Sequence, residues 1–323
     1  MNDYINVSVL VPIYGVEKYI ERCARSLFEQ TMKEGIEFIF TDDCTPDNSV
    51  AVLIEVLNDY PERKSQVKII RHEENKGLAV ARVTGLKAAK GEYVIHCDSD
   101  DWPEFDMYEV MYHHAKTNDS DIVICDFYEG DDNSEEYRRQ NVPEEPLDIF
   151  KAIINESLHS AMWNKMVRKK YLEKINVNVN PEISMWEDMA YMTPVLISGG
   201  KISKIDKALY HYRCIPLSMS RTLSVKTINS KIKVAEYISE YIHSLPYSND
   251  FGTWLDLLKL KSKDCYLILG ETYNQQLWRQ TFPESHKSIF SKPIPIIKKV
   301  LYSLCDQHLD FLARILVGLR KKV

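Results

Sequence analysis

The sequence lacks several features that mark whole classes of protein. Its seven cysteines include no Cys-x-x-Cys pair, which argues against a zinc site or a disulfide framework and favours free thiols in a reducing compartment. No apolar run approaches the roughly 20 residues that cross a bilayer. The N-terminal stretch MNDYINVSVLVP lacks the basic and apolar segments of a signal peptide. We therefore expect a soluble, cytoplasmic protein.

An excess of basic residues is also lacking. The 41 Lys and Arg residues stand against 47 Asp and Glu residues, a net charge of −6, and no basic stripe is interleaved with aromatic residues. Nucleic acid is therefore not an expected partner. The 323 residues have an ordinary globular composition and suffice for one large domain and a smaller one.

Short apolar runs alternate with helical patterns along the first part of the chain. Strands are expected at residues 7–13, 36–41, 67–72, 93–97 and 121–128, and helices at 19–30, 50–57 and 77–91. This alternation predicts an α/β fold whose mostly parallel sheet has helices on both faces. Residues 129–146 predict a solvated loop or an exposed hairpin, and helical segments are expected at 228–242, 251–269 and 296–319.

Polar residues follow three of the expected strands: Tyr14 after the first, Asp42-Asp43 after the second and Asp98-Ser99-Asp100-Asp101 after the fourth. Because the carboxyl ends of parallel strands share one edge of a sheet, one site there would gather all of them. Successive carboxylates at a strand end suit Mg²⁺ or Mn²⁺. The alternative is that Asp101 caps the segment that starts at Pro103.

Three further features lie at this edge, and two of them allow more than one interpretation. Asp43 could accept the N–H of a nucleobase on which Tyr14 packs, or belong to a turn before a helix. Asn75-Lys76-Gly77 opens the third helix, whose N-terminus favours anions. Arg82, further along that helix, could pair with Asp98 or with a phosphate, or lie at the surface.

In this order and spacing, four motifs resemble those of the family 2 glycosyltransferases of GT-A fold: Val9-Leu10-Val11-Pro12-x-Tyr14, Asp42-Asp43-x-Thr45-Pro46-Asp47, Asn75-x-Gly77-x-x-x-Ala81-Arg82 and Gly91-Glu92-Tyr93-x-x-x-x-Asp98-Ser99-Asp100-Asp101. Weaker matches follow at Trp163-Asn164-Lys165, Trp186-Glu187-Asp188, Tyr210–Arg213 and Ser218-Met219-Ser220. The resemblance implies a Rossmann-like GT-A domain over residues 1–225, with a nucleotide-sugar half at 1–110 and an acceptor half at 111–225. A C-terminal helical appendage at 226–323 would follow it.

The resemblance also implies roles for individual residues. Asp43 would bind uracil, Asp98 would lie near the ribose and the metal, and Asp100 would bind Mn²⁺ or Mg²⁺ directly. The implied nucleotide-binding residues are Pro12, Tyr14, Asp43, Lys76, Arg82, Asp98 and Ser99. Asp188 would be the general base, with Glu187 in reserve. Arg213, Ser218 and Ser220 resemble a lid near the diphosphate.

Chemical reasoning beside the resemblance leads to a similar site. When a nucleoside diphosphate leaves, negative charge builds on its phosphate, and a divalent ion stabilises that charge. The acceptor hydroxyl must lose a proton, which a base on the opposite face can take. The plain alternative for Asp188 is a first-turn helix acid. Trp102 and Trp186 are either core residues or aromatic faces for an acceptor sugar. None of His72, His96 and His211 has metal-ligand spacing, so packing or surface roles are expected for them.

The C-terminal stretch FLARILVGLRKKV forms an amphipathic pattern with basic residues. Such a helix either packs on the core or lies on an anionic membrane surface.

We therefore expect an inverting glycosyltransferase of hexosyltransferase type. It would move a sugar from a UDP-sugar to a hydroxyl of a glycan or lipid-linked acceptor, in bacterial surface polysaccharide synthesis. A homodimer and peripheral contact with the inner face of the cytoplasmic membrane remain open. The alternatives are a catalytically degenerate nucleotide-sugar-binding module and a sugar-nucleotide pyrophosphorylase. The latter needs a Gly-rich loop after the first strand, where this chain has the single Gly15.

Overall fold

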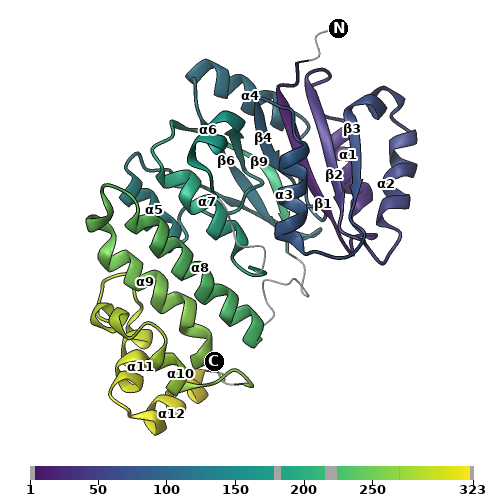
Figure 1. The fold of residues 1–323 in the computed structure, drawn as a ribbon. Helices are drawn as coiled ribbons and strands as arrows, with labels where there is room; N and C mark the ends of the chain where they lie inside the picture. The colour runs from purple at the N-terminus through teal and green to yellow at the C-terminus, as the bar shows by residue number, and fades with distance from the viewer. Residues whose placement is uncertain (1–3, 178–182, 215–223, 269, 321–323) are drawn as a thin grey trace.

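A mixed sheet with helices on both faces forms the upper part of the molecule in the computed structural model (Figure 1). The structure describes residues 4–177, 183–214, 224–268 and 270–320. Within them the strand order is β3-β2-β1-β4-β8-β6-β9-β5, and β7 pairs with β6 beside this path. The strands are β1 (Val7–Ile13), β2 (Ile36–Asp42), β3 (Val67–Arg71), β4 (Tyr93–His96), β5 (Trp102–Pro103), β6 (Ile122–Gly130), β7 (Glu135–Arg138), β8 (Lys165–Arg168) and β9 (Ile202–Arg213).

Helices flank this sheet and continue beyond it to the C-terminus. Those among the strands are α1 (Ile20–Phe28), α2 (Ser49–Asn58), α3 (Leu78–Ala88), α4 (Met107–Asn118), α5 (Pro146–Ile154), α6 (Lys169–Ile175) and α7 (Glu187–Ile197). Those after the last strand are α8 (Val225–His243), α9 (Gly252–Lys263), α10 (Gln275–Gln280), α11 (Ile296–Asp306) and α12 (Asp310–Arg320).

The first four strands in space, β3-β2-β1-β4, are parallel, as the alternation in the sequence predicts. β1 pairs with β2 from Val7↔Ile36 to Ile13↔Asp42, so the two strands end level with each other. Successive side chains of a strand point to opposite faces. Val9 accordingly belongs to the core shared with α1, α2 and α4, whereas Leu10 belongs to the core on the other face. Both faces are covered, which is why β1 is apolar apart from Ser8.

The second half of the sheet is mixed and differs from the expectation. β8 lies antiparallel between β4 and β6, while β9 runs parallel to β6 and then pairs with β5. The sequence interpretation missed β5, β8 and β9, and it assigned Arg213 to a lid although this residue ends β9. The β9 stretch ISKIDKALYHYR has charged residues in its first half and few fully buried positions, so it lacks the apolar run of a central strand.

The expected polar segment at 129–146 contains an exposed hairpin, in which β7 pairs with the end of β6.

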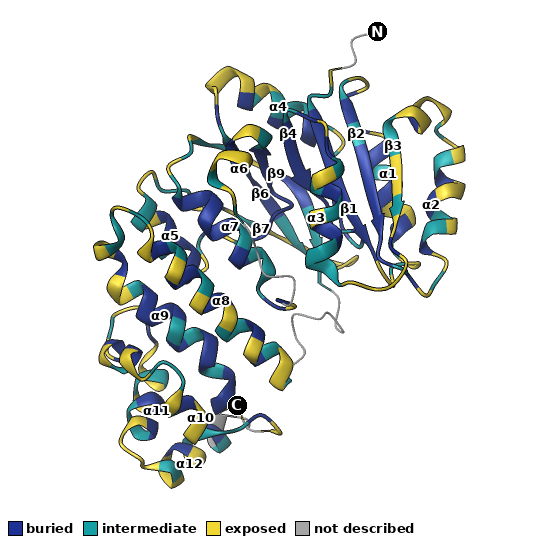
Figure 2. Ribbon diagram, in the orientation of Figure 1, coloured by how far each residue is buried: buried dark blue, intermediate teal, exposed yellow. Residues whose placement is uncertain are grey.

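The helical C-terminal segment is confirmed, with Ile228, Ala235 and Ile238 of α8 fully buried. The expected helix at 296–319 is wrong in one respect, because α11 ends at Asp306 and α12 starts at Asp310. His308 between them has φ 59°, which interrupts helical geometry. Figure 2 shows the sheet largely buried and the last helices with exposed faces. Among the helices described, none combines the length and the apolar character required to span a bilayer.

Candidate active site

Three strand ends and the start of α7 form the candidate site. Ile13 of β1 and Asp42 of β2 are paired at the carboxyl edge, and β4 lies beside β1. The loop after β1 is tied to the loop after β2, because Gly15 N donates to Thr45 Oγ1 over 2.9 Å. Tyr14, at the same edge, is 51% exposed and presents its ring to solvent. The expected convergence of these segments at one edge is therefore present.

Asp43 is buried under the start of α3. Its Oδ1 accepts from Lys76 N over 2.9 Å, and its Oδ2 accepts from Gly77 N over 2.8 Å. Gly77 has φ 88°, a left-handed conformation that favours glycine and turns its amide toward the carboxylate. The carboxylate thus occupies the anion-binding position at this helix N-terminus, which the sequence interpretation had assigned to a ligand. Oδ2 accepts one recorded hydrogen bond, and a carboxylate oxygen has two lone pairs.

Two hydrogen bonds of His72 fix the orientation of Asp43. His72 Nδ1 is 2.7 Å from Asp43 Oδ1, and His72 Nε2 is 2.9 Å from Thr84 Oγ1 on α3. The packing role expected for His72 is therefore a specific one, since it fixes the orientation of the carboxylate. Spacing along the sequence gave no sign of this contact, because it joins the ends of two neighbouring strands. Lys76 has an exposed side chain at the same loop, and Pro12 is buried in β1.

Arg82 is the centre of a buried ionic cluster. It donates to Asp98 Oδ1 over 2.9 Å and to Glu187 Oε1 over 3.2 Å, and it contacts Asp188 Oδ1 as well. The Arg82 side chain is 5% exposed, whereas the side chains of its three partners keep 18–24% of their surface exposed. The guanidinium therefore lies beneath the three carboxylates, which remain accessible to a ligand. The pairing of Arg82 with Asp98 is the arrangement that the sequence allowed for.

Asp188 and Glu187 begin α7. Trp186 just before them has φ 64°, which is unusual for a bulky residue and is the kind of strain found at functional sites. Burial raises the pKa of Asp188, Arg82 lowers it, and Glu187 and Asp98 raise it again, so that the pKa reaches about 7. A carboxylate with this pKa is suited to accept a proton near neutral pH. The ring of Trp186 is partly buried, with Lys231 Nζ 5.1 Å from its centroid.

The aspartates after β4 take different partners. Asp101 is 1% exposed; it accepts from Tyr210 Oη over 3.0 Å and from Arg213 N over 2.8 Å. It thus ties this loop to β9 and does not cap the segment that starts at Pro103. Burial, followed by the charge of Asp98, raises the pKa of Asp100 to about 6. Ser99 between them is buried.

No group of three or more His, Cys, Asp or Glu side chains with metal-binding geometry occurs in the described part of the chain. The donors available here are the carboxylates of Asp98 and Asp100. These are hard oxygen ligands at a strand end, and Mg²⁺ commonly binds through one or two protein carboxylates together with substrate phosphates. The carboxylate pair therefore fits a divalent ion that completes its coordination with the diphosphate of a donor.

Trp102 is enclosed in a stack of side chains. Arg22 Cζ lies 3.2 Å from its ring centroid, and His211 stacks on it with centroids 5.0 Å apart. His211 in turn stacks on Tyr128. Because Trp102 is only 9% exposed, the structure favours the core interpretation of this ring over a face for an acceptor sugar. The ring instead connects α1 to β9.

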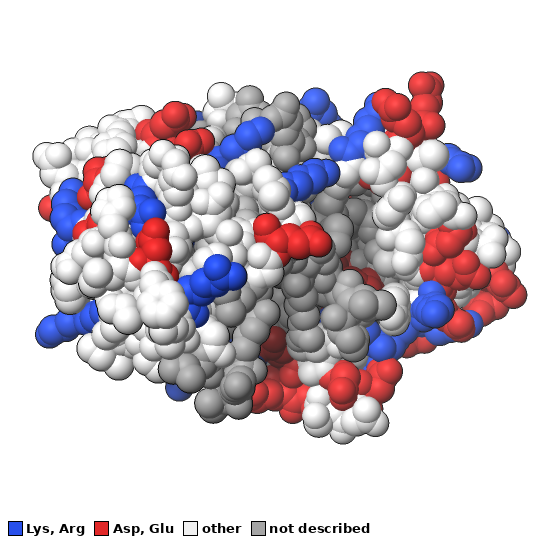
Figure 3. All heavy atoms as spheres, turned by 90° about the horizontal axis from the view of Figure 1, so that it is seen from below, with Lys and Arg blue, Asp and Glu red and all other residues white. Residues whose placement is uncertain are grey.

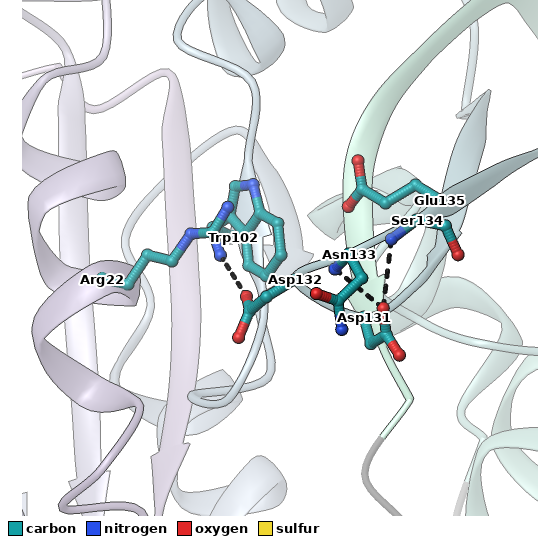
Figure 4. Close-up of a pocket in the computed structure, with 7 residues that line it drawn as sticks. All are labelled: Arg22, Trp102, Asp131, Asp132, Asn133, Ser134 and Glu135. Carbon is teal, nitrogen blue, oxygen red and sulfur yellow. Dashed lines mark hydrogen bonds and ion pairs between the residues drawn. The ribbon is translucent and has the colours of Figure 1, made fainter.

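Arg213 contacts the tip of the β6–β7 hairpin. Its Nη1 and Nη2 donate to the carboxylate of Asp132, each over 2.9 Å, and Arg22 donates to Asp132 Oδ1 over 3.0 Å. Figure 4 shows Arg22, Trp102 and the hairpin tip around a pocket of about 230 Å³. The lid assignment of Arg213 stays a prediction, and Ser218 and Ser220 lie outside the described residues.

The Trp163-Asn164-Lys165 motif supports the site from below. Lys165 Nζ is buried and donates to the carbonyls of His159 and Ala161. Burial lowers the pKa of Lys165 to about 7. Trp163 stacks on Tyr210 with centroids 4.5 Å apart, and Tyr210 in turn holds Asp98 N and Asp101. This motif therefore supports the aspartates after β4 indirectly, through Tyr210 of β9.

Comparison with known proteins agrees with this geometry. Residues 8–176, just over half of the chain, match the family described as Glycosyl transferase family 2. An uncharacterised glycosyltransferase of Bacillus subtilis, EpsJ, is 33% identical over 258 residues, which cover 76% of this chain and 70% of EpsJ. A poly(ribitol-phosphate) beta-glucosyltransferase of Bacillus spizizenii is 36% identical over 122 residues, which cover 37% of this chain and 19% of that enzyme.

The fold is also similar to a solved structure. Residues 1–349 of TarS from S. aureus superpose with a TM-score of 0.74 at 18% identity, covering 98% of this chain and 92% of that one. The same TarS fragment has been solved in complex with UDP and with UDP-GlcNAc. The GT-A fold with C-terminal helices is thereby confirmed. The chain belongs to the family 2 glycosyltransferases and is a glycosyltransferase.

Proposed function

We propose that this enzyme transfers a sugar from a UDP-sugar to a hydroxyl of a glycan or lipid-linked acceptor, with inversion at the anomeric carbon. The observation that carries the proposal is the buried Arg82, because it holds Asp98 at the nucleotide edge and Asp188 at α7 in one cluster. The Asp98 side of this cluster is suited to a leaving diphosphate, and the Asp188 side is suited to an attacking hydroxyl. The poly(ribitol-phosphate) beta-glucosyltransferase supports an acceptor of the surface-polymer type.

The donor site of this proposal lies at the carboxyl edge of β1, β2 and β4. Tyr14 would stack on the uracil ring, Pro12 would line the base pocket, and Asp43 Oδ2 would accept from the base through its remaining lone pair. The UDP and UDP-GlcNAc complexes of TarS support uridine as the nucleoside. Lys76 extends from the loop before α3, from which an ammonium group could reach a phosphate.

Asp98 and Asp100 would hold the divalent ion. When bound, that ion supplies positive charge to the leaving diphosphate. The two carboxylates would fix its position at the end of β4. Tyr210 Oη, which accepts from Asp98 N and donates to Asp101 Oδ2, would keep the loop in place. Burial beside Asp98 raises the pKa of Asp100 to about 6, and a nearby cation would favour its ionised form.

Asp188 would take the proton of the acceptor hydroxyl. Burial raises the pKa of Asp188, Arg82 lowers it, and Glu187 and Asp98 raise it, which gives about 7. Near neutral pH such a carboxylate is therefore partly ionised and basic enough to accept a proton. Attack from the side opposite to the diphosphate inverts the configuration. We therefore expect a product whose anomeric configuration is opposite to that of the donor, as read by NMR of the isolated product.

Binding of UDP, GDP, ADP and CMP by calorimetry, with Mn²⁺ and then with EDTA, tests the donor and the metal together. We expect UDP to bind in preference to the others and EDTA to weaken this binding at least about tenfold, a loss of 1.4 kcal/mol or more. Asp100→Asn should reproduce the EDTA effect because it removes a carboxylate ligand. Asp148→Asn, an exposed change on α5, is the matched control. Preferential binding of another nucleotide, or UDP binding indifferent to Mn²⁺, would contradict these assignments.

The pH dependence of kcat/KM tests the base. Because Asp188 must be ionised to accept a proton and its pKa is about 7, we expect kcat/KM to rise as the pH increases through that value. Steady-state rates with saturating Mn²⁺ and a soluble acceptor would measure it. An ascending limb near pH 4, the ordinary aspartate value, would show that the base is a different or an unperturbed carboxyl.

Membrane contact through the last helix and a homodimer are two alternatives for the C-terminal helices, and sugar transfer requires neither. The exposed apolar residues of α11 and α12 support an interaction surface there.

A further inference from the structure

Large exposed apolar side chains are concentrated near the C-terminus. Of the eighteen such residues in the described part of the chain, eight fall between residues 290 and 315. They are Phe290, Ile296, Ile297, Val300, Leu309, Phe311, Leu312 and Ile315. Scattered exposed apolar residues are normal, but a concentration of this kind marks an interaction surface. We call these eight residues the C-terminal apolar surface.

Two adjacent helices contribute most of this surface. Ile296, Ile297 and Val300 share one side of α11, while Leu301 and Cys305 of the same helix are buried. On α12, Phe311, Leu312 and Ile315 are exposed, whereas Ala313 and Val317 are buried. Each helix therefore has a buried side that packs on the protein and a second apolar side that does not. Figure 3, seen from below, shows uncharged atoms with both basic and acidic side chains among them on the side of the C-terminal helices.

The start of α12 is fixed to the rest of the protein. Arg279 of α10 donates to both carboxylate oxygens of Asp310, over 2.5 and 3.1 Å, and to Cys305 O over 3.0 Å. Gln275 donates to Asp310 O over 3.0 Å. These bonds hold the helix so that its buried side faces the core. The exposed side is therefore a defined feature of the fold.

The charge of this region is opposite to that of the remaining chain. Residues 286–323 contain eight Lys and Arg residues and two Asp residues, a net charge of +6, whereas the whole chain has −6. Two of these lysines, Lys287 and Lys298, are paired with Asp256 and Asp264 outside this range. Lys292, Lys299 and Arg314 lie beside the C-terminal apolar surface, and within the described residues no ion pair is recorded for them. A basic, apolar face on an otherwise acidic protein is complementary to a surface that is both apolar and anionic.

We propose that the C-terminal apolar surface, with the basic residues around it, docks on an anionic lipid bilayer. Phe311, Leu312 and Ile296 would enter the boundary between headgroups and acyl chains, and the lysines would contact anionic headgroups. A second copy of this chain fits less well, because the two basic surfaces would repel each other. Docking goes beyond sugar transfer and does not depend on it, since none of its residues belongs to the candidate active site.

Co-sedimentation of the full chain with vesicles tests the proposal. We expect binding to vesicles of equal parts phosphatidylglycerol and phosphatidylcholine and much weaker binding to phosphatidylcholine alone, with high salt reducing the former. Phe311→Glu should weaken binding at least about tenfold. The matched control is Ile54→Glu, an equally simple change of an exposed apolar residue on α2, which should bind as the unaltered protein does.

A second pair of measurements keeps the test decisive. Lys292→Glu and Lys299→Glu should each weaken binding to the anionic vesicles by about fivefold, without removing any apolar residue.

Sedimentation equilibrium of the protein and of Phe311→Glu reports the oligomeric state. The proposal is overturned if the anionic vesicles do not bind the protein, or if binding is the same with Phe311→Glu. A dimer that Phe311→Glu dissociates, without vesicle binding, would assign the surface to a second copy. Activity on a soluble acceptor should be unchanged in all these variants, so failure of docking leaves the proposed function intact.

Discussion

Replacement of Asp188 by asparagine is expected to lower kcat by about 10²–10⁴-fold, the usual contribution of a positioned general base. Asparagine has nearly the same size and can still accept from Arg82, but it cannot take a proton. KM for the UDP-sugar and the affinity for UDP should change little, because the base acts on the acceptor. Initial rates over a range of donor and acceptor concentrations, together with UDP calorimetry, would measure both effects.

Glu187→Gln is the matched control for this experiment. Glu187 adjoins Asp188, contacts the same Arg82 and is equally accessible, with 18% of its side chain exposed against 22%. If Glu187→Gln abolishes turnover while Asp188→Asn does not, the two assignments are reversed. If both variants retain full activity, the base lies elsewhere. Retention of the unfolding midpoint in both variants would show that the losses are chemical.

Replacement of Arg82 by methionine is expected to destabilise the protein by about 3–5 kcal/mol at pH 8, because breaking a buried ion pair leaves uncompensated charges. Three carboxylates would then face one another without the guanidinium between them. Denaturant unfolding followed by circular dichroism would measure the loss. Arg25→Met is the control, since Arg25 is a partly exposed residue of α1 with two surface ion pairs and should cost about 1 kcal/mol or less.

The loss in Arg82→Met should shrink as the pH falls. Without Arg82, whose charge lowers the pKa of Asp188, the pKa of that carboxyl rises further above its ordinary value. The folded state then binds more protons than the unfolded state, and stability increases toward acid in the range between the two pKa values. A loss that is small, or that grows as the pH falls, would show that Arg82 is not the charge partner of these carboxylates.

The parallel half of the protein could be predicted from the sequence, and so could the edge at which Tyr14, Asp43 and Asp98 meet. Strands buried on both faces appear as apolar runs, and parallel strands place their carboxyl ends together. The contact between Arg82 and Asp188 could not be derived in this way, because the two residues are 106 positions apart in the sequence. No local sequence pattern indicates that the start of α7 contacts Arg82.

The mixed half escaped prediction for a different reason. β9 is partly polar and lacks the apolar run that identifies a central strand, and β8, with four residues, lacks the length. Their assignment depends on pairing with β6, which is a tertiary interaction. The environment of Trp102 also depends on tertiary contacts, so the sequence left a core residue and an aromatic face as alternatives. A tryptophan beside aspartates is compatible with an open sugar platform, whereas Arg22 and His211 come from α1 and β9 to cover it.

The shared position of Arg82 has a thermodynamic consequence for the proposed reaction. A positive charge held by Asp98 is also felt by Asp188 and favours its ionised form, so occupation of the nucleotide side would strengthen the tendency of the base to be unprotonated. By reciprocity, a proton on Asp188 weakens the binding of a cation at Asp98 by the same factor. Loading of the cation and readiness of the base would thus be linked at one cluster of side chains. The base would be best prepared to accept a proton when the cation is in place.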